Sequence, residues 1–294
     1  RAIELTAPRG EIADRLGVPL AGNRSSFTVL LYRESIKNAD ATTRFLAGKL
    51  AVDPEDLESK LRRSRKTGLY RPIPVKEDAG MEDISIIEAH RRDHPEIQLV
   101  PAPRRLYHHG ALAAHLLGYM GEVTEEELKQ KVFPSADSGS LVGQSGIERM
   151  YNEALVGRRG ERLVLVDSRG REVGFLGETS PVAGGNIRLT LDLGIQSAAE
   201  KALEGRVGAI VAMDPRNGEI LAMASAPSFD PNAFSTRLSH DDWQSLLEDA
   251  DRPLQNRCIQ NSYPPGSIFK LVMAAAGLEE GLIDDTTSVF CSGS

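Results

Sequence analysis

A serine and a lysine three positions apart carry the clearest chemical signal in this chain. Ser267 and Lys270 lie in the stretch "SYPPGSIFKLVMAAAGL", and side chains with this spacing share one face of a helix. The neighbours of Lys270 are apolar, and burial of a lysine favours its neutral form. A neutral lysine beside a serine hydroxyl can act as its base, so the pair predicts a serine nucleophile that works without histidine.

The residues before Ser267 predict how the pair is positioned. Pro264 and Pro265 favour an extended entry, and Gly266 permits a sharp turn into a helix. Ser267 then falls in the first turn of an apolar helix over 268–278, where free backbone N–H groups favour a developing negative charge. The structural alternative is a serine that caps the helix and a lysine whose amine extends into solvent.

Length and composition limit the other possibilities. The 294 residues suffice for about two domains. The net charge is −7, from 35 Lys and Arg against 42 Asp and Glu, which argues against a general nucleic-acid binder. Cys258 and Cys291 cannot form a disulfide framework, and the sequence leaves open whether they form one bridge or pack as small apolar side chains. No stretch approaches the ~20 apolar residues of a membrane span.

In the N-terminal half the patterns mix strands and helices. Residues 1–30 predict strands joined by a turn at "DRLG", and two helices follow within 38–63. Asp53 is the expected N-cap of the second helix, with Pro54 at its first position. A short amphipathic helix is expected from Met81.

Further along, residues 111–120 predict an apolar helix, and Thr124 with Glu127 forms a capping box that opens another helix. The remaining expected elements are a hairpin turning at 167–170, a linker at 180–186, a helix from Leu193, a hairpin turning at Asn217-Gly218, and a loop region over 228–261 that carries Trp243.

Several segments together resemble one family. "SYPPGSIFK" is similar to the active-site motif of penicillin-binding proteins. "APRGEIADRLGVPLAGN" resembles the segment that follows the membrane anchor of class B members, and "RRLYHHGALAAHLLGYMGEV" and "GQSGIERMYNEALVGRRGERLVLVDSRGREV" resemble their non-catalytic pedestal. "LTLDLGIQSAAEKALEG", "GAIVAMDPRNGEILAMASAPSFDPNAF" and "DRPLQNRCIQNSYPPGSIFK" resemble the start of their transpeptidase domain. The double proline and "PLQNR" are more similar to the elongation type, penicillin-binding protein 2, than to the division type.

This resemblance implies a multidomain α+β fold. Residues 1–185 are expected to form an elongated pedestal of the dimerisation type, with a helical head over roughly 39–100. Residues 186–294 are expected to form the first part of the transpeptidase domain, a sheet packed against helices.

The resemblance also implies an activity, namely D,D-transpeptidation that cross-links peptidoglycan stem peptides during cell elongation. Ser267 matches the nucleophile and Lys270 the general base. β-Lactams are expected to acylate the same serine, and no metal or cofactor is implied. The implied partners are a RodA-type membrane glycosyltransferase and an MreC-type scaffold, with no nucleic acid. A single-pass anchor is expected before Arg1, which places the rest in the periplasm or outside the cell.

The sequence departs from the family pattern after Lys270. The family's Ser-x-Asn and Lys-Thr-Gly motifs do not occur in the remaining 24 residues (294 − 270). They help to build the oxyanion hole, and losing one such donor costs ~10²–10³ in rate, so we expect the 294 residues alone to be inactive. Lys66-Thr67-Gly68 precedes the nucleophile, and we interpret it as a solvated turn.

Two alternative functions remain open at this stage. The pedestal could dock and activate a glycan polymerase without any acyl transfer. A penicillin sensor or a class D-like β-lactamase also uses Ser-x-x-Lys, although the long pedestal argues against the β-lactamase.

The other chemistry-bearing residues favour structural roles. His108, His109 and His115 lack the i, i+4 spacing of helical zinc pairs, so we expect surface or packing histidines. We expect Arg9-Gly10 and Asp14-Arg15 to pair at the base of the pedestal. The core face of a helix is expected to consist of Leu112, Leu116, Leu117 and Met120. An acidic first turn is expected from Glu125, Glu126 and Glu127, and residues 157–162 are expected to form either a solvated turn or an interaction surface.

Overall fold

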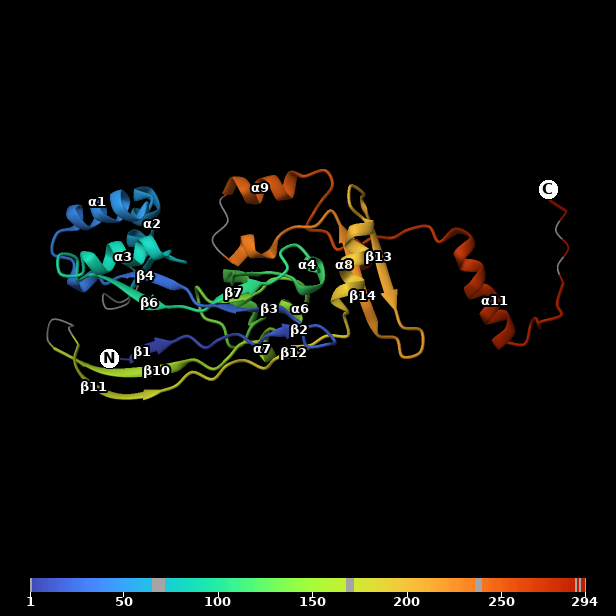
Figure 1. Cartoon of the computed structure of the whole chain (residues 1–294), viewed down its shortest axis with the longest axis horizontal. Coiled ribbons are helices and arrows are strands. Elements are labelled where there is room, and N and C mark those ends of the chain that lie inside the picture. Colours follow the sequence, from blue (N-terminus) through green and yellow to red (C-terminus); the bar gives the residue numbers. More distant parts are fainter. Residues whose placement is uncertain are drawn as a thin grey trace. The chain divides into compact units, whose positions relative to one another are not determined.

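The computed structural model describes residues 2–64, 72–167, 172–235, 240–288, 290, 292 and 293. The chain separates into two compact units, Arg1–Cys258 and Ile259–Ser294, which we describe one at a time. Helices and mainly antiparallel sheets occur together in the first unit, which confirms the expected α+β class (Figure 1). None of the helices in the described ranges combines the length and the apolar character that a membrane span requires.

Residues 27–101 form a region that we call the head. Its sheet has the strand order β5-β4-β6, with antiparallel pairing throughout. The apolar side chains that alternate along β4, Val29 and Leu31, pack with Phe45, Leu46 and Leu57 from the helices. The head elements are β4 (Phe27–Leu31), η1 (Arg33–Ser35), α1 (Ala39–Leu50), α2 (Pro54–Ser64), β5 (Ile73–Lys76), α3 (Met81–Ala89) and β6 (Ile97–Pro101).

Helix starts in the head follow the local signals. Asp53 accepts a hydrogen bond from the backbone of Glu55 at 3.0 Å, so it caps α2 as predicted, and Pro54 is the first helical residue. The helices predicted within 38–63 and from Met81 are confirmed. They cover one face of a three-stranded sheet, so the head is not purely helical.

A second sheet, which we call the body sheet, has the strand order β12-β2-β3-β7. Here β12 runs parallel to β2, and the other neighbours are antiparallel. Its core includes Ile12, Leu20, Tyr107 and Leu155. The elements are β2 (Ile12–Ala13), β3 (Pro19–Arg24), β7 (Arg104–Tyr107) and β12 (Ile187–Arg188), with α4 (Ala114–Leu117), β8 (Met120–Glu122), α5 (Glu125–Gln130), β9 (Leu141–Gly143), α6 (Gly146–Met150) and α7 (Asn152–Leu155).

The predicted hairpin near 160–177 belongs to a third sheet. Its strand order is β1-β10-β11, with β1 (Ala2–Leu5), β10 (Gly160–Val166) and β11 (Glu172–Thr179). The hairpin is confirmed, but its expected turn at 167–170 lies largely outside the described residues. The solvated turn expected over 157–162 is wrong in part, because residues 160–162 belong to β10 and Arg158 forms a bridge with Val182.

The segment 189–258 completes the first unit. Helix α8 (Leu193–Ala202) packs on the hairpin of β13 (Gly208–Met213) and β14 (Ile220–Ala226) through Ala199, Leu203, Ala222 and Ala224. The predicted turn is confirmed, because Gly218 has the positive φ of 78° that favours glycine. The expected loop over 228–261 is wrong in part: it contains η2 (Pro231–Ser235), α9 (His240–Glu248) and α10 (Arg257–Gln260), and Trp243 lies on α9.

The apolar helix predicted over 111–120 is also wrong in extent, since α4 has only four residues. Ala113 and Gly118 at its two ends have φ of 57° and 83°, and left-handed residues interrupt a right-handed helix. The core role expected for its apolar side chains is confirmed: Leu117 and Met120 are buried, and Leu112 and Leu116 pack against the body core. The capping box of Thr124 and Glu127 on α5 is confirmed as well.

The second unit contains η3 (Gly266–Ile268) followed directly by α11 (Phe269–Glu279). Ile268 and Phe269 both have right-handed helical dihedral angles, so the 3₁₀ turn continues into the helix. The predicted helix over 268–278 is therefore confirmed to within one residue at each end.

Candidate active site

Ser267 lies in the η3 turn, and Lys270 lies in the first turn of α11. The sharp turn predicted at Gly266 is confirmed, because its φ of 54° is in the left-handed region that glycine adopts without strain. The extended entry predicted for the two prolines is wrong at Pro265, which has right-handed helical dihedral angles, with φ of −70° and ψ of −21°. The backbone N–H of Phe269 bonds to the carbonyls of Gly266 and Ser267. Positions i and i+3 overlie one another in a 3₁₀ turn and are neighbours in an α-helix, so the serine and the lysine fall on the same side.

The environment of the lysine differs from the expectation. Ser267 and Lys270 are both exposed, and the structure records no hydrogen bond between these two described side chains. The apolar neighbours Ile268, Phe269 and Leu271 are also at least half exposed, so no layer covers α11 within the second unit. The shielded amine that we expected is therefore not found there, and the roles of Ser267 and Lys270 stay predictions.

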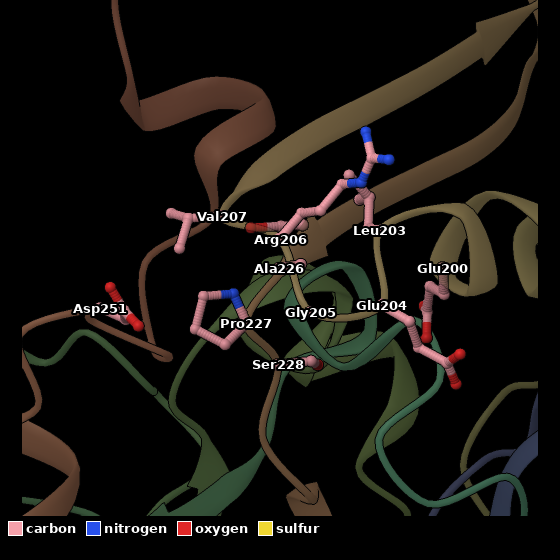
Figure 2. A pocket seen from close by; sticks show the side chains of 11 residues that line it. Glu200, Leu203, Glu204, Gly205, Arg206, Val207, Ala226, Pro227, Ser228 and Asp251 are labelled. Carbon is pink, nitrogen blue, oxygen red and sulfur yellow. The ribbon is translucent and has the colours of Figure 1, made fainter.

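A separate hollow of about 380 Å³ lies in the first unit. Figure 2 shows Glu200 and Glu204 on one side of it, Asp251 on the other, and Pro227 between them. The lining residues all come from 200–251, so neither Ser267 nor Lys270 contributes to it. The hollow offers carboxylates and one arginine but no activated nucleophile, and we assign it no role in acyl transfer.

A charged cluster that the sequence did not predict lies inside the body. The Glu148 carboxylate is fully buried and accepts hydrogen bonds from Arg9 Nε at 2.7 Å and Arg105 Nε at 2.6 Å. Arg9 also donates to Asn152 Oδ1 at 3.1 Å. Burial lowers the pKa of Arg9 and raises that of Tyr107, with the Glu148 charge opposing the first shift and adding to the second. The cluster joins three distant segments.

The pairing expected at the pedestal base is different in detail. Arg9 pairs with Glu148, whereas Asp14 accepts backbone hydrogen bonds from Leu16 and Val18, both at 2.8 Å, and closes the turn between β2 and β3. Arg15 lies 3.4 Å from a Glu219 oxygen. The structural roles predicted for these side chains are confirmed, but their partners were not predicted.

The segment after β14 attaches to the body through an asparagine. Asn232 donates to the carbonyl of Tyr107 and accepts from its backbone N–H, both at 2.9 Å, as a neighbouring strand would. Phe234 stacks on Tyr119 at 4.1 Å between ring centroids. These contacts fix η2 against the edge of β7.

The three histidines considered as metal ligands differ in their exposure. His108 and His109 are exposed, whereas the His115 ring is buried and bonds to the Pro253 carbonyl at 2.6 Å. Across the described ranges, no group of three or more His, Cys, Asp or Glu side chains could hold a metal. Cys258 is a free thiol, and burial raises its pKa. Cys291 and Lys66-Thr67-Gly68 lie outside the described residues.

Comparisons with known proteins identify the same family as the sequence segments that resemble penicillin-binding proteins. A family model of the penicillin-binding protein dimerisation domain matches residues 4–189, and one of the penicillin-binding protein transpeptidase domain matches 208–294. The peptidoglycan D,D-transpeptidase MrdA of Acinetobacter baumannii is 37% identical over 288 residues, which cover 97% of this chain and 42% of that protein. MrdA of Escherichia coli K12 is 32% identical, with 100% of this chain and 47% of that protein covered.

Solved structures give the same result. Penicillin-binding protein 2 of Helicobacter pylori, in a complex with MreC, superposes with a TM-score of 0.82 at 30% identity, covering 98% of this chain and 55% of that one. A second structure of the Helicobacter pylori protein superposes with a TM-score of 0.72. The chain thus spans about half the length of the relatives it matches.

Proposed function

Because this chain belongs to the penicillin-binding protein family, we propose that the whole protein is a serine-type D,D-transpeptidase that cross-links peptidoglycan stem peptides during cell elongation. The resemblance read from its motifs is confirmed by both family models. The observation that carries the proposal is the placement of Ser267 and Lys270 on one side of a glycine-initiated helix. That placement is what a serine nucleophile with a lysine base requires.

In the proposed reaction, Ser267 Oγ attacks the carbonyl carbon of the D-Ala-D-Ala bond, and Lys270 takes the hydroxyl proton. The C–N bond then breaks, and D-alanine leaves with a proton. An amine of a neighbouring stem peptide attacks the resulting ester, which restores the serine and forms the cross-link. A β-lactam would acylate the same oxygen by opening its ring.

The apolar surface of α11 supports this assignment. Leu271, Val272 and Met273 are all more than half exposed, and an apolar helix face needs a second layer to bury it. In the whole protein we expect such a layer to shield Lys270 and to favour its neutral form.

Penicillin labelling of the whole protein tests the proposal. We expect Ser267→Ala to abolish covalent labelling by a fluorescent penicillin, and Lys270→Ala to slow acylation by about 10²–10⁴-fold, as for loss of a general base. Ser262→Ala is the matched control, since this exposed serine lies five residues upstream in the same segment. Equal labelling of wild type and Ser267→Ala would remove Ser267 from the mechanism.

We also propose the assembly in which the enzyme works. The pedestal, residues 1–185, would bind an MreC-type scaffold and a RodA-type glycosyltransferase outside the cytoplasmic membrane, and the transpeptidase part would begin at 186. The complex named for the Helicobacter pylori relative supports the first partner. Binding to MreC-type protein should survive Ser267→Ala, and a pull-down in which the wild-type protein captures none would contradict this assignment.

A further inference from the structure

We propose that Arg104 couples the head to the segment after β14, so that a movement of the head changes how the η2 turn is held. The inference rests on the proposed function in one respect: η2 lies within the segment that matches the transpeptidase domain.

One buried guanidinium contacts both regions. Arg104, at the start of β7, is 6% exposed. Its Nη1 donates to the Ser235 carbonyl at 2.6 Å, and its Nη2 donates to the Glu77 carboxylate. Glu77 follows β5 in the head, and Ser235 is the last residue of η2. A planar guanidinium can serve two acceptors at once, because its N–H groups point in fixed directions.

The contact lies where the head joins the body. The chain crosses this junction twice, through residues 25–26 and 102–103. Arg24 and Arg104 are directly paired across β3 and β7 at this end of the body sheet. Arg24 donates to Asp78, and Arg104 donates to the adjacent Glu77. Two neighbouring arginines of the body therefore hold two consecutive carboxylates of the head.

The turn that carries these carboxylates depends on them. Asp78 has a φ of 56°, which is uncommon for a residue with a side chain and persists where surrounding contacts hold it. Its carboxylate also accepts from Ser26 Oγ at 2.7 Å, in the first of the two crossings. The position of this turn relative to the body is thus set by side-chain contacts in addition to the two covalent crossings.

Of the two arginines, Arg104 alone extends to η2 among the described residues. Arg24 is partly exposed, and its hydrogen bonds go to Asp78. At the far end, the Ser235 hydroxyl is buried and finds no partner in the described part of the chain, so the Arg104 bond to the carbonyl supplies the polar contact there. Asn232 holds the start of the same turn to β7.

This geometry links two events. If the head carries Glu77 away, the guanidinium must either follow it and release Ser235 or stay buried with one partner fewer. Asp78 acts on this buried guanidinium through charge alone, whereas Glu77 bonds to it directly. Removing the bonded carboxylate of a buried charge is unfavourable, so the loss of one contact weakens the other. Such coupling is reciprocal, because each contact biases the other by the same amount.

Hydrogen exchange of the whole protein tests the coupling. We expect Glu77→Gln, which removes the charge, to speed amide exchange in 232–235 about fivefold, the difference between a charged and a neutral hydrogen bond. The matched comparison is Asp78→Asn, which removes a neighbouring charge that acts on Arg104 without a hydrogen bond to it and should therefore speed exchange in 232–235 less than Glu77→Gln does. In the other direction, Asn232→Ala should speed exchange of the Ala79 amide, which bonds to the Phe27 carbonyl in the head.

A second variant keeps the test decisive if Glu77→Gln unfolds. Arg104→Lys retains the positive charge but lacks the two guanidinium nitrogens that bond to Glu77 and Ser235 at the same time. It should therefore give the same faster exchange in 232–235. The inference is overturned if Glu77→Gln and Asp78→Asn change this segment equally, or if neither Glu77→Gln nor Arg104→Lys changes it. Exchange requires no acylation, so this outcome is independent of penicillin labelling at Ser267.

Discussion

Glu148 shows how one side chain fixes three parts of the fold. Its carboxylate is fully buried between Arg9 and Arg105. Glu148→Gln would leave two buried guanidinium groups without a counter-charge, so we expect it to lower the free energy of unfolding by about 3–5 kcal/mol. Urea denaturation measures the change.

The control is Glu161→Gln, an exposed carboxylate on β10, for which we expect a change within about 0.5 kcal/mol. Similar losses for both variants would contradict the idea that Glu148 organises the cluster. This role could not be predicted from the sequence, because Arg9, Arg105 and Glu148 are far apart along the chain and no local pattern relates them. The only feature of the sequence that indicates such a cluster is the presence of a charged residue at each of these three positions.

At the scale of the elements, the segment 180–186 closes against α7. It was predicted as a linker, but Gly184 donates to the Pro8 carbonyl at 3.0 Å and Gly185 to the Ala154 carbonyl at 2.8 Å. A Cβ on Gly184 would lie 1.8 Å from the Leu155 carbonyl oxygen. Because backbone must shift to admit it, we expect Gly184→Ala to cost about 1–3 kcal/mol of unfolding free energy, measured by urea denaturation.

Gly177→Ala provides the comparison, since no atom lies within 4 Å of a Cβ there. It should be neutral or slightly stabilising, because alanine reduces the freedom of the unfolded chain. If Gly184→Ala is as stable as Gly177→Ala, the close approach does not constrain this segment.

Elements with local signals were predictable, and those set by packing were not. The cap at Asp53, the capping box at Thr124 and the turn at Gly218 depend on neighbours within a few residues, and all three are confirmed. Helix α4 is short because residues at its ends adopt left-handed backbone, which no residue type there required except Gly118. Helix α9 did carry a signal, since Trp243, Leu246 and Leu247 have helical spacing.

At the scale of the molecule, the resemblance of sequence segments predicted which domain comes first along the chain. The contacts between distant segments could be identified only from the structure. The candidate site follows the same division: the glycine turn before Ser267 was predictable because it is local. The exposure of Lys270 was not predictable, because cover for α11 depends on side chains far from it in the sequence. Asn232 and His115 both bind backbone carbonyls of distant segments, which leaves no trace in residue spacing.

His115 makes the junction between the body and the segment 229–257 sensitive to acid. Its ring contacts Phe229 edge-on at 5.2 Å between centroids and bonds to the Pro253 carbonyl. Burial lowers the pKa of His115, the nearby Arg257 charge lowers it further, and the bond to Pro253 opposes both. The folded protein therefore binds the proton less readily than the unfolded chain, whose histidine titrates near 6.5.

It follows that the stability from neutral His115 is fully present above pH about 6.5 and is lost as the pH falls through the folded-state value. We expect the free energy of unfolding of wild type to fall more steeply from pH 7.5 to 5.5 than that of His115→Gln, which cannot take up a proton. Urea denaturation of both proteins at these pH values measures the difference in slope. Parallel profiles would contradict the assignment, because a ring that titrates alike in both states contributes nothing to the pH dependence.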